Sequence, residues 1–389
     1  MRLKWGAIVK IKILVLALTL IFAQSVYAKD APSSWQPELK IGVMFNLKNA
    51  TILTNSDCFF IAKDKKVRIK KGEVLAITFN ASHVEIKGNK FEGELWEIRP
   101  DDPRKLKDLV FRINGKSYRG GLRLIRKGNA MTAINVIPSE EYLRGVVPEE
   151  MPPLWAKEAL KAQTVAARTF ALKNRHRHKK DGYDLCTSVH CQVYSGQAKE
   201  HENSDAAIRE TYGEVLFAMP NGPIIDTPFH TDSGGMTENN EALWGVGIPY
   251  LRAAKELEEK TKPWDKEIPL FEFEKKVGLK DIKKIELSKL EFGKRTKDRT
   301  VSGRVKQVLV ASEKQSKFLT GAELRNLFNL SSTLFDMELS SKSVKFSGYG
   351  IGHGVGLSQW GAKAFAENGM NYKDILVHYY KKTFIKKLY

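Results

Sequence analysis

The sequence predicts an α+β protein with a β-rich N-terminal part, a mixed α/β core and a substrate cleft. Three observations predict this class. Residues 38–135 contain short runs in which apolar and polar residues alternate, as in half-buried strands. Residues 156–174 are rich in alanine and contain neither Gly nor Pro, which favours a helix. The C-terminal part alternates a glycine-rich loop with further helical segments.

The first 28 residues have the composition of a secretory signal peptide. Four cations come first, and an apolar run follows at residues 13–23. Val26 and Ala28 fit the pattern recognised by signal peptidase, and the apolar run is short for a membrane span. We therefore expect export to the periplasm or cell envelope, with cleavage after Ala28. An uncleaved anchor, the alternative, would export the rest of the chain equally.

The chain is strongly basic, with a formal net charge of +19, of which +15 remains after the four leader cations are removed. In a cytosolic protein this charge would indicate nucleic acid. An exported protein instead meets anionic walls and membrane surfaces, so we expect no nucleic-acid partner. Three cysteines are too few for a disulfide-built scaffold, and Cys58, beside two phenylalanines, is expected to be a core thiol.

The elements follow in order along the chain. Strands are expected in the N-terminal part at 40–45, 67–70, 84–87 and 122–125. The pattern changes near Pro138, so we assign residues 136–389 to the core. Pro152 and Pro153 suit the start of the alanine-rich helix, where a missing amide hydrogen costs nothing. The small side chains of that helix indicate close packing against a neighbour.

The second half of the core is less regular. Residues 252–300 are rich in charge and are expected to form a surface excursion that includes a short helix at 270–276. Strands are expected to resume at 303–311. Helices are expected at 358–367 and 372–380.

Four segments carry the residues that indicate function. They are Glu141–Pro152 continued by Glu158–Ala171, then Asp184–Gly196, Thr231–Asn239 and Gly350–Gly361. In this order they resemble the stage II sporulation protein D (SpoIID/LytB) family, and weaker echoes extend the resemblance over roughly residues 38–380. Four long motifs in one order are far more specific than a single short pattern.

The resemblance implies an activity on the glycan strands of peptidoglycan. Sporulation members of the family are lytic transglycosylases that prefer strands whose stem peptides have been removed, and they leave 1,6-anhydro-muramyl ends. Other members are described as enhancers of a cell-wall amidase. We therefore predict a lytic transglycosylase that needs no cofactor for catalysis. The alternative is a non-catalytic glycan-binding protein whose partner is a cell-wall amidase.

Glu150 is the expected catalytic acid, because the motif glutamate of the family falls there and not on Glu149. One carboxyl suffices in a lytic transglycosylase, since the 6-hydroxyl of the muramyl sugar is the nucleophile. Apolar neighbours such as Val147 and Met151 favour the protonated carboxyl, while an adjacent helix start would favour the carboxylate. From residue chemistry alone, Glu150 is an exposed acid in a loop or a first helical turn.

The resemblance also implies substrate-binding or orienting roles for Gln163, Arg168, His353 and Gln359. Each has a purely structural alternative. Gln163 and Arg168 would be a packed polar residue and a surface cation of one helix. The alternating glycines around His353 either let a ligand approach the backbone closely or pack against the core. Ser358 is expected to cap the helix that follows.

Cys186, His190 and Cys191 form a candidate zinc site. Some members of the family bind zinc here with a further upstream histidine, which in this chain is His178 or His176. His178 stands eight residues before Cys186, whereas the family pattern has six. Thiolate and imidazole ligands in one loop suit a closed structural site. Zinc, a disulfide and two free thiols remain open, and a zinc-dependent hydrolase is disfavoured because no second ligand cluster accompanies the cysteines.

Overall fold

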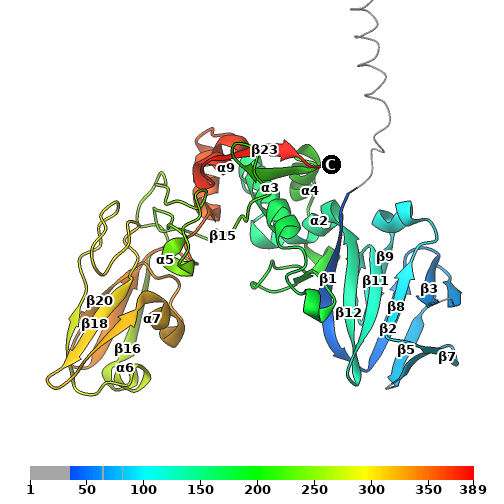
Figure 1. The fold of residues 1–389 in the computed structure, drawn as a ribbon, viewed down its shortest axis with the longest axis horizontal. Helices are drawn as coiled ribbons and strands as arrows, with labels where there is room; N and C mark the ends of the chain where they lie inside the picture. Colours follow the sequence, from blue (N-terminus) through cyan, green and yellow to red (C-terminus); the bar gives the residue numbers. More distant parts are fainter. Residues whose placement is uncertain (1–35, 64, 81) are drawn as a thin grey trace, which may run out of the picture. The chain divides into compact units, whose positions relative to one another are not determined.

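The computed structural model describes residues 36–63, 65–80 and 82–389. The predicted signal peptide, residues 1–28, lies outside them. The described part contains both helices and strands, with the strands concentrated at its N-terminal end (Figure 1), which confirms the α+β class. Among the residues described, no helix has the length and apolar character needed to cross a membrane.

The N-terminal part consists of two sheets that share one apolar core. The first has the order β13-β1-β12-β11-β8-β3-β4 and the second β10-β9-β2-β5-β6-β7. Side chains of the two sheets meet in ring contacts, with centroids 6.3 Å apart for Phe79 and Trp96 and 5.1 Å apart for Phe60 and Phe91. Cys58 is fully buried in the same core, as expected.

The alternating pattern located these strands well. The four expected strands correspond to β1, β4, β6 and β11, although β4 and β6 each end one residue earlier than expected. The strands of this part are β1 (Glu38–Leu47), β2 (Asn49–Thr54), β3 (Cys58–Ala62), β4 (Lys65–Ile69), β5 (Leu75–Asn80), β6 (His83–Ile86), β7 (Asn89–Glu92), β8 (Leu95–Arg99), β9 (Val110–Ile113), β10 (Lys116–Arg119), β11 (Gly121–Lys127) and β12 (Ala130–Pro138), and β13 (Leu185–Cys186) joins β1 from the core.

Two helices follow β12, and only one of them was expected. The alanine-rich helix is α3 (Lys157–Lys173), which confirms the prediction for residues 156–174. The prolines expected at its start precede it instead, and Ala156 is its N-cap. The helix before them, α2 (Ser139–Glu150), was missed because Gly145 and Pro148 interrupt its pattern. Gly145 is needed there, since an added Cβ would lie 2.5 Å from the ring of Tyr194.

Helix α3 is the centre of the core. Twelve of its 17 residues are buried. Phe170 packs into the cluster shared with the N-terminal sheets, Val165 into a cluster with the C-terminal helices, and Leu160 into a third cluster with Met151. A helix covered on all sides needs small side chains, which explains its alanine content.

The remaining core elements follow α3 in the chain, and several of them contact it. They are α4 (Glu202–Glu210), β14 (Glu214–Ala218), β15 (Phe229–His230), α5 (Glu241–Trp244), β22 (Leu357–Ser358), α8 (Gln359–Glu367), α9 (Tyr372–Tyr379) and β23 (Thr383–Lys387). Both C-terminal helices were expected. Ser358 caps α8 as predicted, because its hydroxyl accepts the Gly361 N–H at 3.3 Å.

Residues 264–348 fold around a core of their own. Two three-stranded sheets, β16-β21-β20 and β17-β18-β19, contribute to this core together with two helices, whose Phe273 and Phe328 rings stack with centroids 5.1 Å apart. The elements are β16 (Trp264–Pro269), α6 (Leu270–Val277), β17 (Ile282–Glu286), β18 (Gln307–Ser312), β19 (Ser316–Thr320), α7 (Gly321–Phe328), β20 (Phe335–Leu339) and β21 (Ser343–Gly348). We call this segment the inserted module.

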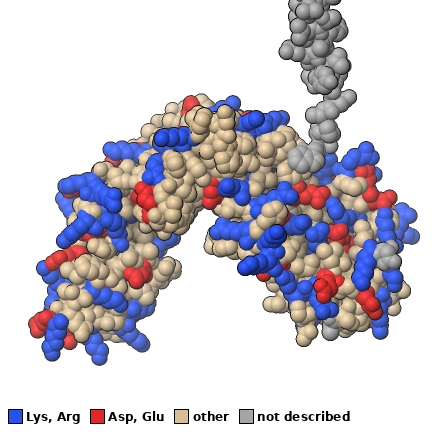
Figure 2. Space-filling model, viewed as in Figure 1, with Lys and Arg blue, Asp and Glu red and all other residues tan. Residues whose placement is uncertain are grey.

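The charge-rich stretch 252–300 supplies β16, α6 and β17 to the inserted module. Its helix lies where expected, whereas the strand expected at 303–311 begins at Gln307. On the face drawn in Figure 2, Lys and Arg side chains spread widely with Asp and Glu scattered among them. On this face the basic charge is therefore a general property of the surface and does not form one patch.

A buried ion pair joins α2 to α3. The Nε and Nη2 of Arg168 each donate to a carboxylate oxygen of Glu140 at 2.8 Å, and both side chains are almost completely buried. Further Arg168 nitrogens donate to the Glu214 carbonyl at 3.2 Å and the Thr211 hydroxyl at 3.4 Å. Bidentate geometry of this kind fixes the two helices in one register.

Removing one partner should leave a buried charge uncompensated. We expect Arg168→Met to lower the free energy of unfolding by about 3–5 kcal/mol, measured by urea denaturation. The matched control is Arg126→Met, whose 3.7 Å pair with Glu94 faces solvent and should contribute about 0–1 kcal/mol. Equal losses in the two variants would contradict the structural role assigned to the buried pair.

Candidate functional site

Glu150 is the last residue of α2, and its carboxyl is held from two other parts of the chain. Its Oε1 accepts the backbone N–H of Val193 at 2.9 Å. The side chain of Gln359, at the start of α8, also hydrogen-bonds the carboxyl. The structure thus brings together Glu150 and Gln359, two of the residues singled out from sequence, although they lie 209 positions apart.

The surroundings of Glu150 favour its protonated form. Burial raises the pKa of this carboxyl, and the negative charge of Glu149 raises it further, while the contacts with Val193 and Gln359 lower it. The net pKa lies above the ordinary value of a glutamate. The expectation of a neighbouring helix start was wrong. Glu150 ends α2, where the partial negative charge of the terminal carbonyls also disfavours a carboxylate.

The amide that holds Glu150 is itself firmly positioned. Gln192 donates to a carbonyl of α3 at 3.3 Å and accepts the hydroxyl of Tyr142 at 3.2 Å. On the other side of Val193, Tyr194 donates to Asn135 of β12 at 2.8 Å. The segment is therefore attached to both helices and to the sheet, which sets the direction of the Val193 N–H.

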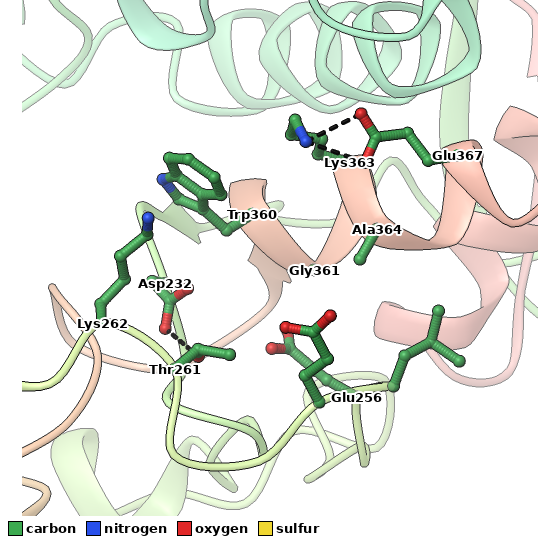
Figure 3. Close-up of a pocket in the computed structure, with 11 residues that line it drawn as sticks. Asp232, Glu256, Thr261, Lys262, Trp360, Gly361, Lys363, Ala364 and Glu367 are labelled. Carbon is green, nitrogen blue, oxygen red and sulfur yellow. Dashed lines mark hydrogen bonds and ion pairs between the residues drawn. The ribbon is translucent and has the colours of Figure 1, made fainter.

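A cavity of about 270 Å³ lies along α8 next to this site. Trp360, which directly follows Gln359, forms part of its wall (Figure 3). Its ring meets Trp155 edge-on with centroids 4.8 Å apart, and the Nζ of Lys262 lies 3.2 Å from its centroid. The two tryptophans thus form an aromatic pair beside Gln359. The predicted substrate cleft as a whole stays a prediction.

Two carboxylates that the sequence did not reveal face this cavity. Asp232 and Glu256 both line it, as Figure 3 shows. Burial raises the pKa of Glu256, and the charge of Asp232 raises it further. The hydroxyl of Tyr379, which donates to Glu256 at 2.9 Å, lowers this pKa in part. Gly361 makes room for this carboxyl, since a Cβ would lie 2.2 Å from its Oε1. Glu256 was missed because its charged neighbours resemble a solvated loop.

The glycines around His353 make room for the protein's own side chains. A Cβ on Gly352 would lie 2.8 Å from the Cβ of His230, and one on Gly354 would lie 2.4 Å from the Nε of Arg304. These contacts support the interpretation of the loop as a turn that packs against the core.

His353 is a neutral side chain whose two ring nitrogens both face backbone groups. Its Nδ1 accepts the Val355 N–H at 3.0 Å, and the ring also hydrogen-bonds the backbone of Phe229. Burial, with the charges of Arg304 and Arg325, lowers the pKa of His353 to about 4. In this arrangement both ring nitrogens are engaged, and only the ring face is left for a ligand. The hydrogen bond from His353 to a sugar stays a prediction.

Gln163 and Arg168 are both fully buried in α3. Arg168 is paired with Glu140 in the interior, so the alternative of a surface cation was wrong. In the described part of the chain, neither polar atom of the Gln163 side chain has a hydrogen-bond partner. Substrate contact by either residue stays a prediction.

His178, Cys186, His190 and Cys191 converge on one point. Their ligand atoms all lie within 4.8 Å of one another. The Sγ of Cys191 is 3.5 Å from Nε2 of His178 and 3.6 Å from Nδ1 of His190, and the Sγ of Cys186 is 3.7 Å from the same Nδ1. Zinc with bonds of about 2.3 Å to sulfur and 2.0 Å to nitrogen separates its ligand atoms by about 3.3–3.8 Å. The donor set and its spacing therefore fit tetrahedral zinc.

The geometry also separates the two upstream histidines. His178 faces the cysteines despite its longer spacing, whereas Nδ1 of His176 lies 3.0 Å from Asp184. Both thiols are free in the structure. Four protein ligands would fill a tetrahedral ion and leave no open position for substrate. Such a site would hold the loop that ends at Val193, two residues beyond Cys191.

Known families match two separate stretches of the chain. The family described as "Stage II sporulation protein" (SpoIID) matches residues 127–217, which contain Glu150 and all four candidate metal ligands. A domain of unknown function (DUF8618) matches residues 245–356, which contain the inserted module.

Curated relatives match more of the chain. An uncharacterized protein of Brachyspira hyodysenteriae is 32% identical over 279 residues, which cover 69% of this chain and 72% of the relative. Stage II sporulation protein D of Bacillus amyloliquefaciens is 33% identical over 273 residues, covering 64% and 74%. A protein named amidase enhancer from Bacillus subtilis is 29% identical over 361 residues, covering 80% of this chain and 50% of the relative.

The convergence of four ligands generates a test for metal. We expect protein purified without chelator to carry about one zinc per chain, measured by elemental mass spectrometry. Cys186→Ser and Cys191→Ser should lose the ion and unfold at lower temperature, because binding energy at a structural site contributes to folding. Cys58→Ser, which changes a thiol outside the cluster, should keep it. Metal-free protein with an intact mass lowered by two hydrogens would show a disulfide instead.

Proposed function

The chain belongs to the stage II sporulation protein D (SpoIID/LytB) family, which supports a role at the cell wall, and on that premise we propose that it is a lytic transglycosylase of peptidoglycan glycan strands. The observation that carries the proposal is the state of Glu150. Its carboxyl is partly buried at a helix C-terminus, has a raised pKa, and lies beside Gln359 and the aromatic pair.

The proposed reaction uses this one carboxyl twice. Protonated Glu150 gives its proton to the glycosidic oxygen while the bond from that oxygen to C1 of the muramyl sugar breaks. The positive charge that develops on the sugar ring lies near the carboxylate just formed. The carboxylate then takes the proton of the muramyl 6-hydroxyl, and the oxygen of that hydroxyl bonds to C1. The product carries a 1,6-anhydro ring, no water is consumed, and Glu150 is protonated again.

The neighbours of Glu150 suit both halves of this cycle. Burial and Glu149 favour the protonated acid needed at the start. The Val193 N–H and the Gln359 side chain then stabilise the carboxylate that exists between the two proton transfers. These opposed influences keep the two protonation states close in energy, as a group that is alternately acid and base requires.

The rest of the proposal concerns substrate, place and metal. We propose that the protein acts on strands in the periplasm or cell envelope, with peptide-stripped strands as the preferred substrate. Zinc would be structural and not catalytic, because all four ligand positions come from the protein. Its part would be to hold Val193 against Glu150.

One finding favours a second candidate function. The relative named amidase enhancer covers more of this chain than the other relatives described. Under this alternative the protein binds glycan and stimulates a cell-wall amidase without cutting strands itself. Both functions would use the surface around Glu150, so they differ in products and not in binding.

Glu150→Gln separates the two functions. The amide keeps the shape of the side chain but cannot transfer the proton, so turnover of purified strands should fall by ~10²–10⁴-fold while binding survives. Glu149→Gln, one residue away, should lose far less turnover.

Mass spectrometry of the parent's products should show 1,6-anhydro-muramyl ends. Products that have gained water would require a second carboxylate. If neither protein cut strands and both stimulated an amidase equally, the enhancer function would replace this proposal.

The raised pKa of Glu150 predicts the direction of the pH dependence. The acid must be protonated, so turnover should be retained below the pKa of Glu150 and lost as the pH rises through it. That loss should occur above the range of an ordinary glutamate. Glu149→Gln removes a charge that raises this pKa and should shift the loss to lower pH. If the pH profile of turnover were identical in the parent and the Glu149→Gln protein, the loss of turnover at higher pH could not be assigned to Glu150.

A further inference from the structure

A second and larger cavity, of about 710 Å³, lies between α5 and residues 295–307. It shares no lining residue with the cavity beside Glu150. The two cavities are nevertheless close in space. Arg304 of the second donates from Nη2 to the carbonyl of Ser233 at 2.7 Å, and the neighbouring Asp232 lines the first. We call it the module cavity.

Arg304 is a buried cation without a matched counter-charge. Its side chain is 1% exposed, and within the described residues its Nε and Nη1 have no hydrogen-bond partner. The charges of Glu238, Glu256 and Asp232 act on Arg304, but in the described part none of these carboxylates lies within ion-pair distance of it. Burial lowers the pKa of Arg304 to about 10, so it stays charged at neutral pH. A buried charge of this kind is costly unless something compensates it.

The other charged residues that line the cavity add to its excess of positive charge. Arg295 and Lys306 contribute two further cations, and in the described part neither has a carboxylate within ion-pair distance. The remaining lining acid, Glu241, is paired with Arg252 at 2.8 Å. An occupant of this cavity should therefore carry negative charge.

The cavity lining also includes one aromatic side chain. Trp244 of α5 lines the cavity while remaining 49% exposed, and its ring lies 6.1 Å from that of His353. Tryptophan offers a broad apolar face. A cavity lined by a tryptophan and by three cations suits an acidic sugar, which has an apolar ring face and a carboxylate.

We propose that the module cavity binds a muramyl residue of the glycan strand and that Arg304, with Arg295, recognises the lactyl carboxylate exposed when the stem peptide has been removed. This inference rests on the proposed function for its substrate. In a strand that keeps its peptides, the lactyl group is an uncharged amide and the attraction is absent. The unpartnered nitrogens of Arg304 are covered by the cavity wall, so that residue acts through its charge, while Arg295 is exposed and can meet the carboxylate directly.

The test is a binding measurement on protein that cannot cut its ligand. Glu150→Gln protein is titrated calorimetrically with three strands of equal length. They are a peptide-free muramyl strand, the same strand with its lactyl carboxylates converted to methylamides, and an oligomer of N-acetylglucosamine alone. We expect the carboxylate strand to bind about tenfold more tightly than either neutral strand. Equal affinity for the carboxylate and methylamide strands would overturn the proposal.

Variants in the same background locate the effect. Arg295→Gln and Trp244→Ala change exposed side chains and should fold normally. Arg295→Gln should remove most of the preference for the carboxylate strand. Trp244→Ala should weaken the binding of all three strands. Arg304→Gln should also abolish the preference, but its fold must be verified because the side chain is buried. Arg209→Gln removes the same charge from the exposed face of α4. If it reduced the preference as much as Arg295→Gln, the attraction would come from net charge and the proposal would be wrong.

The inference and the proposed function can fail separately. A carboxylate preference in a protein whose parent form cuts no strand would support the module cavity and reject the transglycosylase. Cleavage by the parent at equal rates on carboxylate and methylamide strands, without a binding preference, would reject the module cavity and leave the transglycosylase standing.

Discussion

The buried pair of Arg168 and Glu140 is the constraint on which the rest of the core depends. It ties the first turn of α2 to the middle of α3, a helix that is itself packed on all sides. The far end of α2, where Glu150 lies, is therefore placed by a contact about ten residues away. A buried pair contributes little net stability compared with apolar side chains, but it allows few alternative arrangements. Position, more than stability, is what it supplies.

Three separate segments then build the surroundings of Glu150. The end of α2 brings the carboxyl, the segment after Cys191 brings a backbone amide, and the start of α8 brings Gln359. The candidate metal ligands lie directly before that amide. A closed four-ligand centre at this point would act on catalysis only through the position of Val193, as an outer support that orients a reacting group.

Much of the fold could be predicted from local patterns, whereas the contacts at the site could not. The strands and α3 have clear periodicity or composition, and they were found. Helix α2 was missed because Gly145 and Pro148, which disfavour helices locally, are offset by tertiary packing against Tyr194. That error also reversed the expected influence of the helix dipole on Glu150. Glu256 shows the same limit, since a charged run gives no sign that one member is turned inward.

The inserted module begins and ends on neighbouring strands, because Trp264 of β16 pairs with Gly348 of β21. Just outside it, the Gly350 N–H donates to the Thr261 carbonyl at 3.0 Å, and Asp232 pairs with Ile351. The chain thus leaves the core and returns at one point, the geometry that tolerates exchange of one domain for another. Recombination could replace or excise the module while the core around Glu150 stays closed. Specificity and chemistry could therefore evolve independently in this architecture.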